Sequence, residues 1–304
     1  MAFYLMGDYI REQRERLGVT QEDLCEGICS PGTLSKIENG RQSVRLNQYI
    51  ALMERLGLPV QPIGVQVTEE EMEWYRLKRE ISYKLSANDC DVAEQLQRME
   101  SCSLGMEKST EQFSVLVRAV IKKASGECGQ NVLDMLVTAI RYTYPNFDIE
   151  SVSSVRLLTY DEIMIIDNIG SMLKKCGDVM EAIMWERFLK GYLEGAGIDY
   201  DEKARVYPMI LYNLSTCLIE CHQYEEAIRI CSDGIEYCNA HGKLNSLMEL
   251  IYTKGICCAE IKDRENATLY LTYSFVIAKM RGNTKKVKSI EESFSYYGLS
   301  KVIP

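Results

Sequence analysis

The chain has 304 residues, enough for two domains, and its 46% apolar and 26% charged residues are an ordinary globular balance. It has only 6 prolines and no sustained alternation of β-branched with polar residues, which disfavours a β protein and favours an all-α fold. The net charge is −9, but residues 1–57 carry 7 Lys and Arg against 8 Asp and Glu, so most of the acidity lies behind them. No apolar run approaches the length of a membrane span, and Gly7-Asp8 ends the apolar start of the chain, so we expect a cytoplasmic protein without membrane association.

Short helices are predicted at the beginning of the chain. The first lies within residues 7–18, where Ile10 and Leu17 are seven positions apart and Gly18 is the stop signal. The second begins after Thr20, a good N-cap residue, and is very short because a glycine follows soon after.

Two further helices complete this segment. Ser30-Pro31 combines a capping serine with a proline at the first helical position, so a third helix begins there and ends near Asn39. A fourth is predicted over residues 45–56 from apolar residues at helical spacing. Two short helices joined by a tight glycine-bearing turn, with a helix on either side, are typical of a helix-turn-helix.

The first 50 or so residues resemble the lambda-repressor-like, or XRE-type, helix-turn-helix family. The shared marks follow one another without a gap at the family's spacing. They are Ile10, Arg14, Leu17-Gly18, the run from Thr20 to Leu24, and the run from Ser35 to Gly40.

This resemblance implies that the third helix enters the major groove and that the start of the second contacts the DNA backbone. Thr33 and Lys36 would project from the recognition helix, and Gln21 would bond the backbone or a base. The other residues of the set would contact phosphates, which position the protein without reading sequence. The predicted DNA-binding residues are Arg11, Arg14, Gln21, Thr33, Lys36, Asn39 and Arg41.

The recognition helix departs from the family's pattern at its start. Ser30-Pro31-Gly32 supplies few long polar side chains that could reach base edges. Docking to DNA is therefore better supported than reading of its sequence. A helix-turn-helix used only for protein contacts is the alternative interpretation.

A boundary is predicted next, because Gly57 to Gly64 contains two prolines and two glycines in eight residues. Helix resumes at Thr68-Glu69-Glu70-Glu71, a capping-box pattern. We therefore predict a helix-turn-helix domain with its linker over residues 1–64, and a TPR-like sensing and dimerisation domain over residues 65–304.

Three segments fit the tetratricopeptide pattern, a helix pair with small or apolar residues at fixed offsets. They align on Ile169-Gly170, Leu214-Ser215 and Lys254-Gly255, whose starts lie 45 and 40 residues apart. Because the usual repeat is about 34 residues, longer helices or loops must connect them. Residues 72–104 and 111–145 are weaker candidates. The prediction is an α-solenoid of degenerate TPR-like helix pairs.

Stacked helix pairs form a concave groove lined by the first helix of each pair. One repeat position, just before the alignment pairs, holds Asn168, Asn213 and Thr253. A carboxamide both donates and accepts, so it could pair with a peptide backbone, although bonding to a neighbouring helix is an equally simple use. The predicted peptide-binding residues are Asn168, Ser171, Lys174, Lys175, Tyr212, Asn213, Thr216 and Glu220.

Most of the twelve cysteines fall on apolar helix faces, where a reduced thiol packs as a small hydrophobe. Cys217, Cys221 and His222 lack an accompanying Cys-x-x-Cys pair, so we expect neither a metal nor a cofactor. Residues 284–304 are predicted to form a capping helix and tail. Its lysines indicate a solvated face or part of a dimer interface.

The whole architecture resembles the RRNPP group of peptide-sensing regulators of Gram-positive bacteria. The resemblance implies a homodimeric transcriptional regulator that binds double-stranded DNA. It also implies that the TPR-like domain binds a short intracellular signalling peptide, which alters operator binding.

Other interpretations stay open at this point. The repeat domain could bind a partner protein instead of a peptide, or the protein could be a phage-type lysis–lysogeny switch. An enzyme is disfavoured because neither His222 nor His241 lies beside a nucleophile pattern. The sequence also has no P-loop, no glycine-rich dinucleotide motif and no metalloprotease helix.

Overall fold

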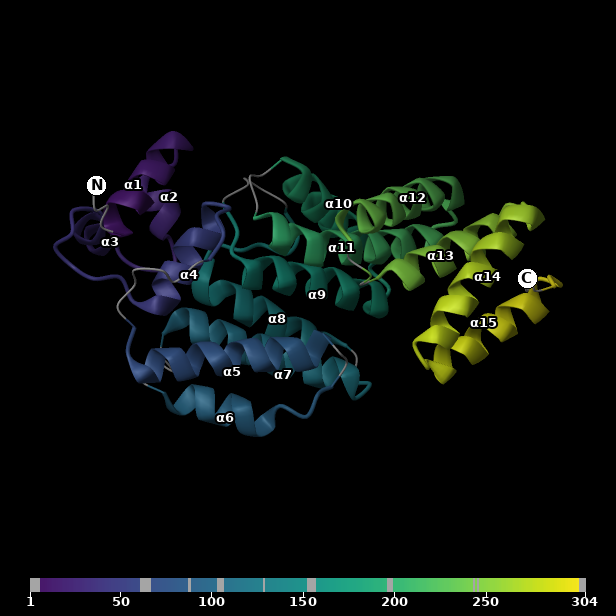
Figure 1. Cartoon of the computed structure of the whole chain (residues 1–304), viewed down its shortest axis with the longest axis horizontal. Helices are drawn as coiled ribbons and strands as arrows, with labels where there is room; N and C mark the ends of the chain where they lie inside the picture. The colour runs from purple at the N-terminus through teal and green to yellow at the C-terminus, as the bar shows by residue number, and fades with distance from the viewer. Residues whose placement is uncertain are drawn as a thin grey trace. The chain divides into compact units, whose positions relative to one another are not determined.

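The computed structural model describes nine stretches of the chain: residues 6–60, 67–86, 89–102, 107–127, 129–151, 157–195, 199–242, 244 and 246–300. Within them all regular structure is helical, with fifteen helices and no strand (Figure 1). This confirms the all-α prediction. The chain divides into two compact units, Met1–Cys176 with Gly195–Asp199, and Gly177–Glu194 with Tyr200–Pro304. Each unit is described by itself.

Unit 1 begins with a four-helix head, and all four helices were predicted. Thr20 caps the second helix by accepting from the backbone N–H of Asp23, and Ser30 caps the third by accepting from that of Thr33. Each cap satisfies an N–H group that has no partner inside its helix. The helices are α1 (Met6–Arg16), α2 (Gln21–Cys25), α3 (Pro31–Glu38) and α4 (Leu46–Arg55).

Fully buried apolar side chains from three helices meet at the centre of the head. Ile10, Leu24 and Leu34, one from each of α1, α2 and α3, have no exposed surface. Helices α1 and α3 also meet at backbone distance, because a Cβ on Gly7 would lie 1.8 Å from the carbonyl oxygen of Ile37. Only glycine therefore allows α1 this position against the recognition helix.

Five more helices complete unit 1 as a stack of neighbours. Helices α5 and α6 pack together, α7 packs on α8, and α9 packs on both α8 and α7. The predicted capping box is present: Glu71 N–H donates to the Thr68 hydroxyl, and Thr68 N–H donates to the Glu71 carboxylate. The helices are α5 (Glu69–Ser86), α6 (Ala93–Ser101), α7 (Lys108–Ala124), α8 (Gln130–Thr143) and α9 (Tyr160–Cys176).

The head and the helices behind it share one hydrophobic core. It runs from the head through Trp74 and Ile81 of α5 to Phe113 and Val117 of α7. The Trp74 indole donates to the hydroxyl of Thr110 at 3.1 Å, so the largest side chain of this core is also hydrogen-bonded. The predicted linker lies partly outside the described residues, and the boundary at residue 64 stays a prediction.

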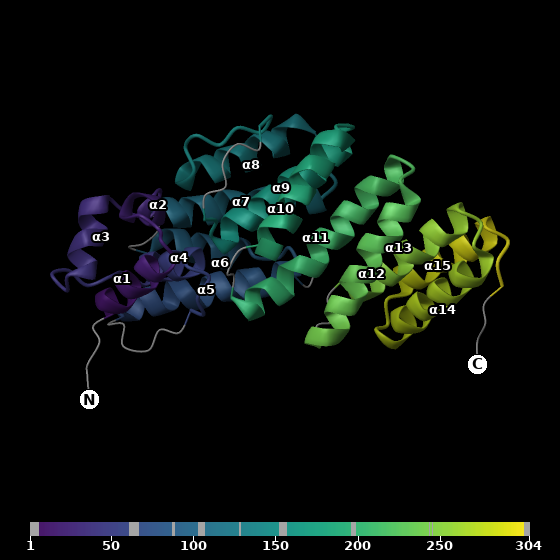
Figure 2. The same ribbon diagram turned by 90° about the horizontal axis from the view of Figure 1, so that it is seen from above.

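Unit 2 is a stack of long helices, seen from a second side in Figure 2. From α11 to α15 each helix packs on the next in the chain. Nowhere in the described residues does a helix combine the length and the apolar character that crossing a membrane requires. The helices are α10 (Val179–Gly195), α11 (Tyr200–Glu220), α12 (Tyr224–His241), α13 (Leu247–Glu260), α14 (Arg264–Met280) and α15 (Thr284–Tyr296).

Small residues determine how closely these helices approach, as the repeat pattern predicted. A Cβ on Gly234 would lie 2.8 Å from Leu250, and one on Gly255 would lie 3.0 Å from the backbone nitrogen of Leu271. The pairs α11–α12 and α13–α14 form solenoid-like layers, confirming the predicted architecture. Their spacing is long because α11 has 21 residues and a connecting segment separates α12 from α13.

Candidate functional site

The outer surface of the recognition helix α3 is polar and accessible. Lys36 and Asn39 are exposed, Thr33 is partly exposed, and Arg41 is exposed just after the helix. Arg11 of α1 lies beside this surface, since its guanidinium donates to the Asn39 side chain at 3.4 Å and pairs with Asp8 at 2.9 Å. These residues therefore present donors on one side of the head.

Arg14 is used inside the head. Its Nε and Nη2 donate to the Glu38 carboxylate at 2.7 and 3.0 Å, and its Nη1 donates to the Val19 carbonyl at 3.0 Å. The bond to Glu38 holds the pKa of Arg14 above its ordinary value, so the guanidinium is charged. The guanidinium therefore fastens α1 to α3, and its predicted contact with phosphate stays a prediction.

Gln21 shares the same carboxylate. Its amide nitrogen donates to Glu38 Oε2 from the start of α2, at 2.5 Å. Glu38 is 1% exposed and so joins three helices of the head from within. Gln21 keeps a partly exposed side chain and has the place predicted for a contact at the start of α2, but its amide is oriented by Glu38.

A second buried charge joins the head to α9. Arg55, at the end of α4, donates to the carbonyls of Leu24 and Glu26 and to the carboxylate of Glu162, the last at 3.2 Å. Both charged side chains have no exposed surface. Glu162 also accepts from the Thr143 hydroxyl at 2.6 Å. Hydrogen bonds on both ions offset part of the cost of removing them from water.

The turn of the helix-turn-helix lies against the end of α8. Gly27 has φ +72°, and a Cβ there would lie 2.0 Å from the carbonyl oxygen of Thr143. Thr143 therefore touches the head twice, through its backbone at the turn and through Glu162 at Arg55. Movement of the head would have to disturb both contacts.

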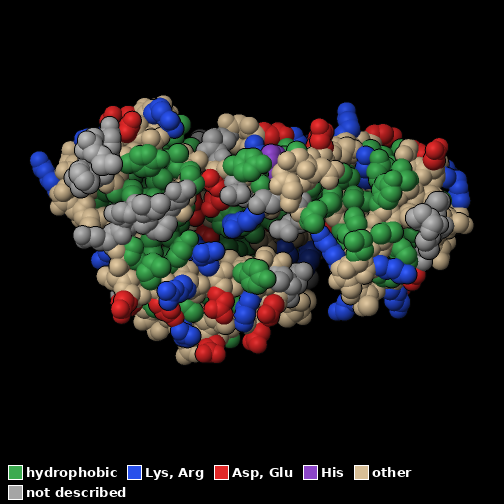
Figure 3. Space-filling model, in the orientation of Figure 1, with side chains coloured by type: hydrophobic (Ala, Val, Ile, Leu, Met, Phe, Trp, Pro, Cys, Tyr) green, Lys and Arg blue, Asp and Glu red, His purple; other side chains and the backbone are tan. Residues whose placement is uncertain are grey.

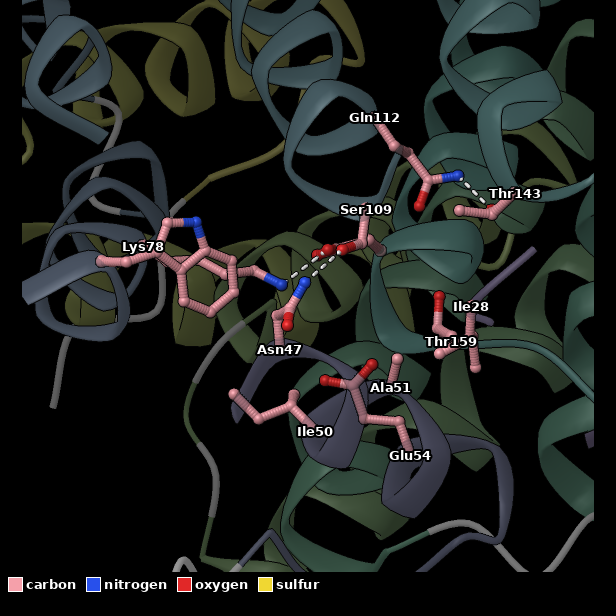
Figure 4. Close-up of a pocket in the computed structure, with 12 residues that line it drawn as sticks. Ile28, Asn47, Ile50, Ala51, Glu54, Lys78, Ser109, Gln112, Thr143 and Thr159 are labelled. Carbon is pink, nitrogen blue, oxygen red and sulfur yellow. Dashed lines mark hydrogen bonds and ion pairs between the residues drawn. The ribbon is translucent and has the colours of Figure 1, made fainter. Parts of the chain in front are cut away.

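We call the contact between the head and the helices behind it the joint. A small pocket lined mostly by polar residues lies within the joint (Figure 4). The Lys78 ammonium pairs with Asp161 at 2.6 Å, and Asn47 donates from its amide to Ser109 at 3.4 Å. The amide oxygen of Asn47 is buried and lacks a hydrogen-bond partner among the described residues. Polar groups from the head, α5, α7 and α9 thus meet here around the Asn47 side chain.

The predicted peptide-binding residues fall in both units. In unit 1, Asn168 is 7% exposed, and its carboxamide donates to the Met164 carbonyl and accepts from Lys123 of α7, both at 2.9 Å. Asn168 therefore joins two helices, which is the alternative use left open above. Ser171 and Lys174 are partly exposed, and Lys175 is exposed, near the end of α9.

In unit 2, Tyr212, Asn213 and Thr216 are partly exposed on α11 and Glu220 is exposed at its end. The Thr216 hydroxyl donates to the Asn213 carbonyl at 2.8 Å. Thr253, the third residue at the repeat position of Asn168 and Asn213, is 4% exposed. Because the residues at this repeat position differ in burial and fall in two units, a common peptide-binding role stays a prediction.

Tyr212 has neighbours that sequence reasoning missed. Burial is the largest cause that raises the pKa of its hydroxyl. Glu249 and Tyr252, both on α13, raise this pKa further. Lys286 of α15 lies over the Tyr252 ring, with its Nζ 3.7 Å from the ring centroid. We call Tyr212, Glu249, Tyr252 and Lys286 the tyrosine–lysine cluster. One signal was present, because Tyr212 and Tyr252 each stand two residues before a repeat alignment pair.

Comparison with known proteins identifies the head. Residues 5–63 match the family model described as a helix-turn-helix domain. This region spans α1 to α4, so the resemblance seen in the sequence is confirmed by both the family match and the fold. No curated protein matches the chain.

Solved structures extend the likeness to the whole chain. PlcR of Bacillus thuringiensis, solved with the peptide PapR7 and DNA, has a TM-score of 0.56 at 16% identity, with 93% of this chain and 98% of that chain covered. The apo form of the competence regulator ComR from Streptococcus vestibularis has a TM-score of 0.53 at 11% identity, with 97% and 98% covered. ComR of S. thermophilus, solved with DNA and its signalling peptide ComS, has a TM-score of 0.50 at 15% identity, with 96% and 99% covered. The chain therefore has the fold of these regulators over nearly its full length.

Proposed function

We propose that this protein is a DNA-binding transcriptional regulator whose helical array binds a short signalling peptide that alters operator binding. One observation carries the proposal. A helix-turn-helix head shares its core with a helical array, in a chain that has the fold of PlcR, which was solved with a peptide and DNA. The proposal includes cytoplasmic location and a role other than catalysis.

The polar face of α3 supports the DNA-binding part. Lys36 and Arg41 are exposed cations, and Asn39 is held by a hydrogen bond from its amide to the Ser35 carbonyl at 2.7 Å. Arg11 and Thr33 lie on the same side, so we retain them in the proposed interface. Arg14 and Gln21 act through Glu38, by fixing the position of α3. Such a face suits phosphate contacts that position the head on DNA.

The joint around Arg55 supports the regulatory part. A peptide changes DNA binding only if it binds two arrangements of the protein with different affinities. The buried pair of Arg55 and Glu162 ties the head to α9, the helix that carries Asn168 and Lys174. A ligand that shifts α9 would therefore act on the head through this pair.

An exposed stripe on α14 supports the homodimer. Four large apolar side chains lie exposed on one face of the helix at spacings of four, three and four residues. Exposed apolar surface of this kind is typical of protein interfaces, and a two-headed protein can bind two half-sites. The residues are Leu269, Tyr273, Val276 and Met280.

Selection from random double-stranded DNA tests the proposed DNA binding. The full chain is expected to enrich a sequence in two related halves, and Lys36→Ala is expected to weaken the selected site by about tenfold and lower the salt dependence. Lys288→Ala changes an exposed lysine of α15. It is the matched control and should bind DNA as the wild type does. If the wild type enriches no sequence over the starting pool, sequence-specific DNA binding is ruled out.

Light scattering after size exclusion tests the homodimer. The wild type is expected at twice the 34.8 kDa chain mass, and Val276→Lys is expected to shift it toward the monomer because a charge would be buried in the interface. Met180→Lys, at an exposed apolar residue of α10, is the control and should remain dimeric. A dimer unaffected by Val276→Lys would exclude the α14 stripe.

A further inference from the structure

The tyrosine–lysine cluster contains a cation without a direct anionic partner. Lys286 is only partly exposed, and its ammonium rests on the Tyr252 ring at 3.7 Å from the centroid. Among the described residues no carboxylate forms an ion pair with it. Burial lowers the pKa of Lys286, with Glu249 acting in the opposite direction, so the charged form is under-compensated in the free protein.

The carboxylates nearby do not fill this role. The charge of Glu249 acts on the pKa of Lys286, but the two side chains form no ion pair among the described residues. Glu260, eleven residues further along α13, accepts a hydrogen bond from the hydroxyl of Tyr297. A partly desolvated ammonium in this setting gains most from an anion supplied by a ligand.

The surroundings of the ammonium suit a peptide. Tyr252 is held by a hydrogen bond between its hydroxyl and that of Ser293, at 2.8 Å, so its ring is oriented by α15. Tyr212 stands at the equivalent place of the preceding repeat, and its pKa responds to both Glu249 and Tyr252. In Figure 3, hydrophobic side chains, with tyrosines counted among them, gather over α13–α15 beside lysine or arginine side chains. Rigid aromatic rings beside a cation can hold an apolar side chain and a carboxylate of one short chain.

We propose that the tyrosine–lysine cluster of unit 2 binds a carboxylate of a short peptide, with Lys286 as the cation that pairs with it. The proposal rests on the peptide-sensing function proposed above and names the chemistry of the ligand. The carboxylate is either the peptide's C-terminus or an acidic side chain. Tyr252 positions the ammonium, and Tyr212 contacts the residue next to the carboxylate.

Affinity selection from synthetic random heptapeptides tests the proposal with the full chain. Three pools distinguish the source of the carboxylate: one with free C-termini, one with C-terminal amides, and one with amides and neither Asp nor Glu. The wild type is expected to enrich peptides from the first pool, from the second if a side chain is the source, and none from the third.

Two variants then assign the effect to one residue. Lys286→Met keeps the unbranched stem against the Tyr252 ring and removes the charge, so the fold is preserved and its thermal unfolding serves as the check. We expect it to weaken the selected peptide by about 10- to 100-fold in calorimetry, the usual loss of a hydrogen bond to a charged group. Lys288→Met, an exposed lysine two residues away, is expected to bind within about twofold of the wild type.

The failures are distinguishable. If the third pool is enriched as well as the first and Lys286→Met binds the selected peptide like the wild type, the carboxylate site is wrong while peptide sensing stands. If the wild type enriches no peptide from any pool, both the site and the proposed function are overturned.

Discussion

The joint between the head and α9 and the helix stack of unit 2 are stabilised in different ways. The joint is built from buried charges and hydrogen bonds, with Arg55, Glu162 and Thr143 at its centre. In the stack, Gly234 and Gly255 let neighbouring leucines approach to contact distance. A polar network has one arrangement in which all its partners are satisfied, whereas small residues between apolar helices mainly limit distance. The joint therefore specifies one orientation of the head against α9, whereas the glycines of the stack mainly set how closely its helices approach.

The two tryptophans of the chain allow this comparison to be measured. Trp74 lies in unit 1 and Trp185 in unit 2, and both are buried. With one replaced by Phe, the fluorescence of the other follows one unit during urea unfolding. Variants of the joint should move the Trp74 transition, and variants of the stack should move the Trp185 transition.

The largest effect is expected from breaking the buried ion pair. Arg55→Met leaves the Glu162 carboxylate buried without its cation, which should lower the free energy of unfolding by about 3–5 kcal/mol at the Trp74 transition. Adding Glu162→Gln removes the stranded charge and should recover more than about 1 kcal/mol. Simple additivity of the two single changes would show that the pair does not couple the head to α9.

A somewhat smaller effect is expected at the turn of the helix-turn-helix. Gly27→Ala places a methyl group against the Thr143 carbonyl in a left-handed backbone, at a cost of about 2–4 kcal/mol. Gly18→Ala is the control, because Gly18 has φ +67° but nothing within 4 Å of an added Cβ. It should cost only the backbone strain, about 1 kcal/mol. Equal losses would mean that contact with α8 contributes nothing.

In unit 2, paired glycine changes should give opposite signs. Gly255→Ala meets the backbone of Leu271 at 3.0 Å and should cost about 1–2 kcal/mol at the Trp185 transition. Gly191→Ala has open space around the new methyl group and should instead gain about 0.5–1 kcal/mol, because alanine favours the helix. A gain from both would show that the α13–α14 approach tolerates more volume.

The smallest perturbation is chemical labelling of thiols in the folded protein. Burial raises the pKa of Cys29 in the head and of Cys231 in unit 2 to about 12 each, so little thiolate exists at pH 8. Cys176 is exposed. Peptide mapping after a brief treatment with dithionitrobenzoate should find Cys176 labelled at least about 10³ times faster than either Cys29 or Cys231. Comparable labelling of Cys231 would indicate that unit 2 opens readily.

Sequence reasoning identified the local features well. The caps at Thr20, Ser30 and Thr68 depend on residues three apart, so they can be read from the chain directly. The spacing of the helix-turn-helix marks is equally local. The burial of Arg55 had no such signal: its helix has polar residues near both ends, and nothing in the sequence names the partner of Arg55.

The predicted site residues were less secure because their roles depend on distant partners. Arg14 and Lys36 are both cations of the head, yet only Arg14 has Glu38 within reach, 24 residues away. Asn168 and Asn213 share a repeat position, yet Lys123 of α7 takes up the carboxamide of Asn168. A repeat frame predicts which face a residue occupies, but not which side chain from another helix reaches it first.

The sequence by itself determined the helical class, the helix-turn-helix and the repeat-like pairing, since each depends on periodicity and capping within a few turns. The tertiary structure alone decided that the head is joined to α9 through Arg55 and Glu162, which are 107 residues apart. It also brought Tyr252 and Lys286 together from different helices. The physical reason is the same in both cases: a buried or half-buried charge is stabilised by whichever partner the packing brings within a few ångströms, and packing is a property of the whole chain.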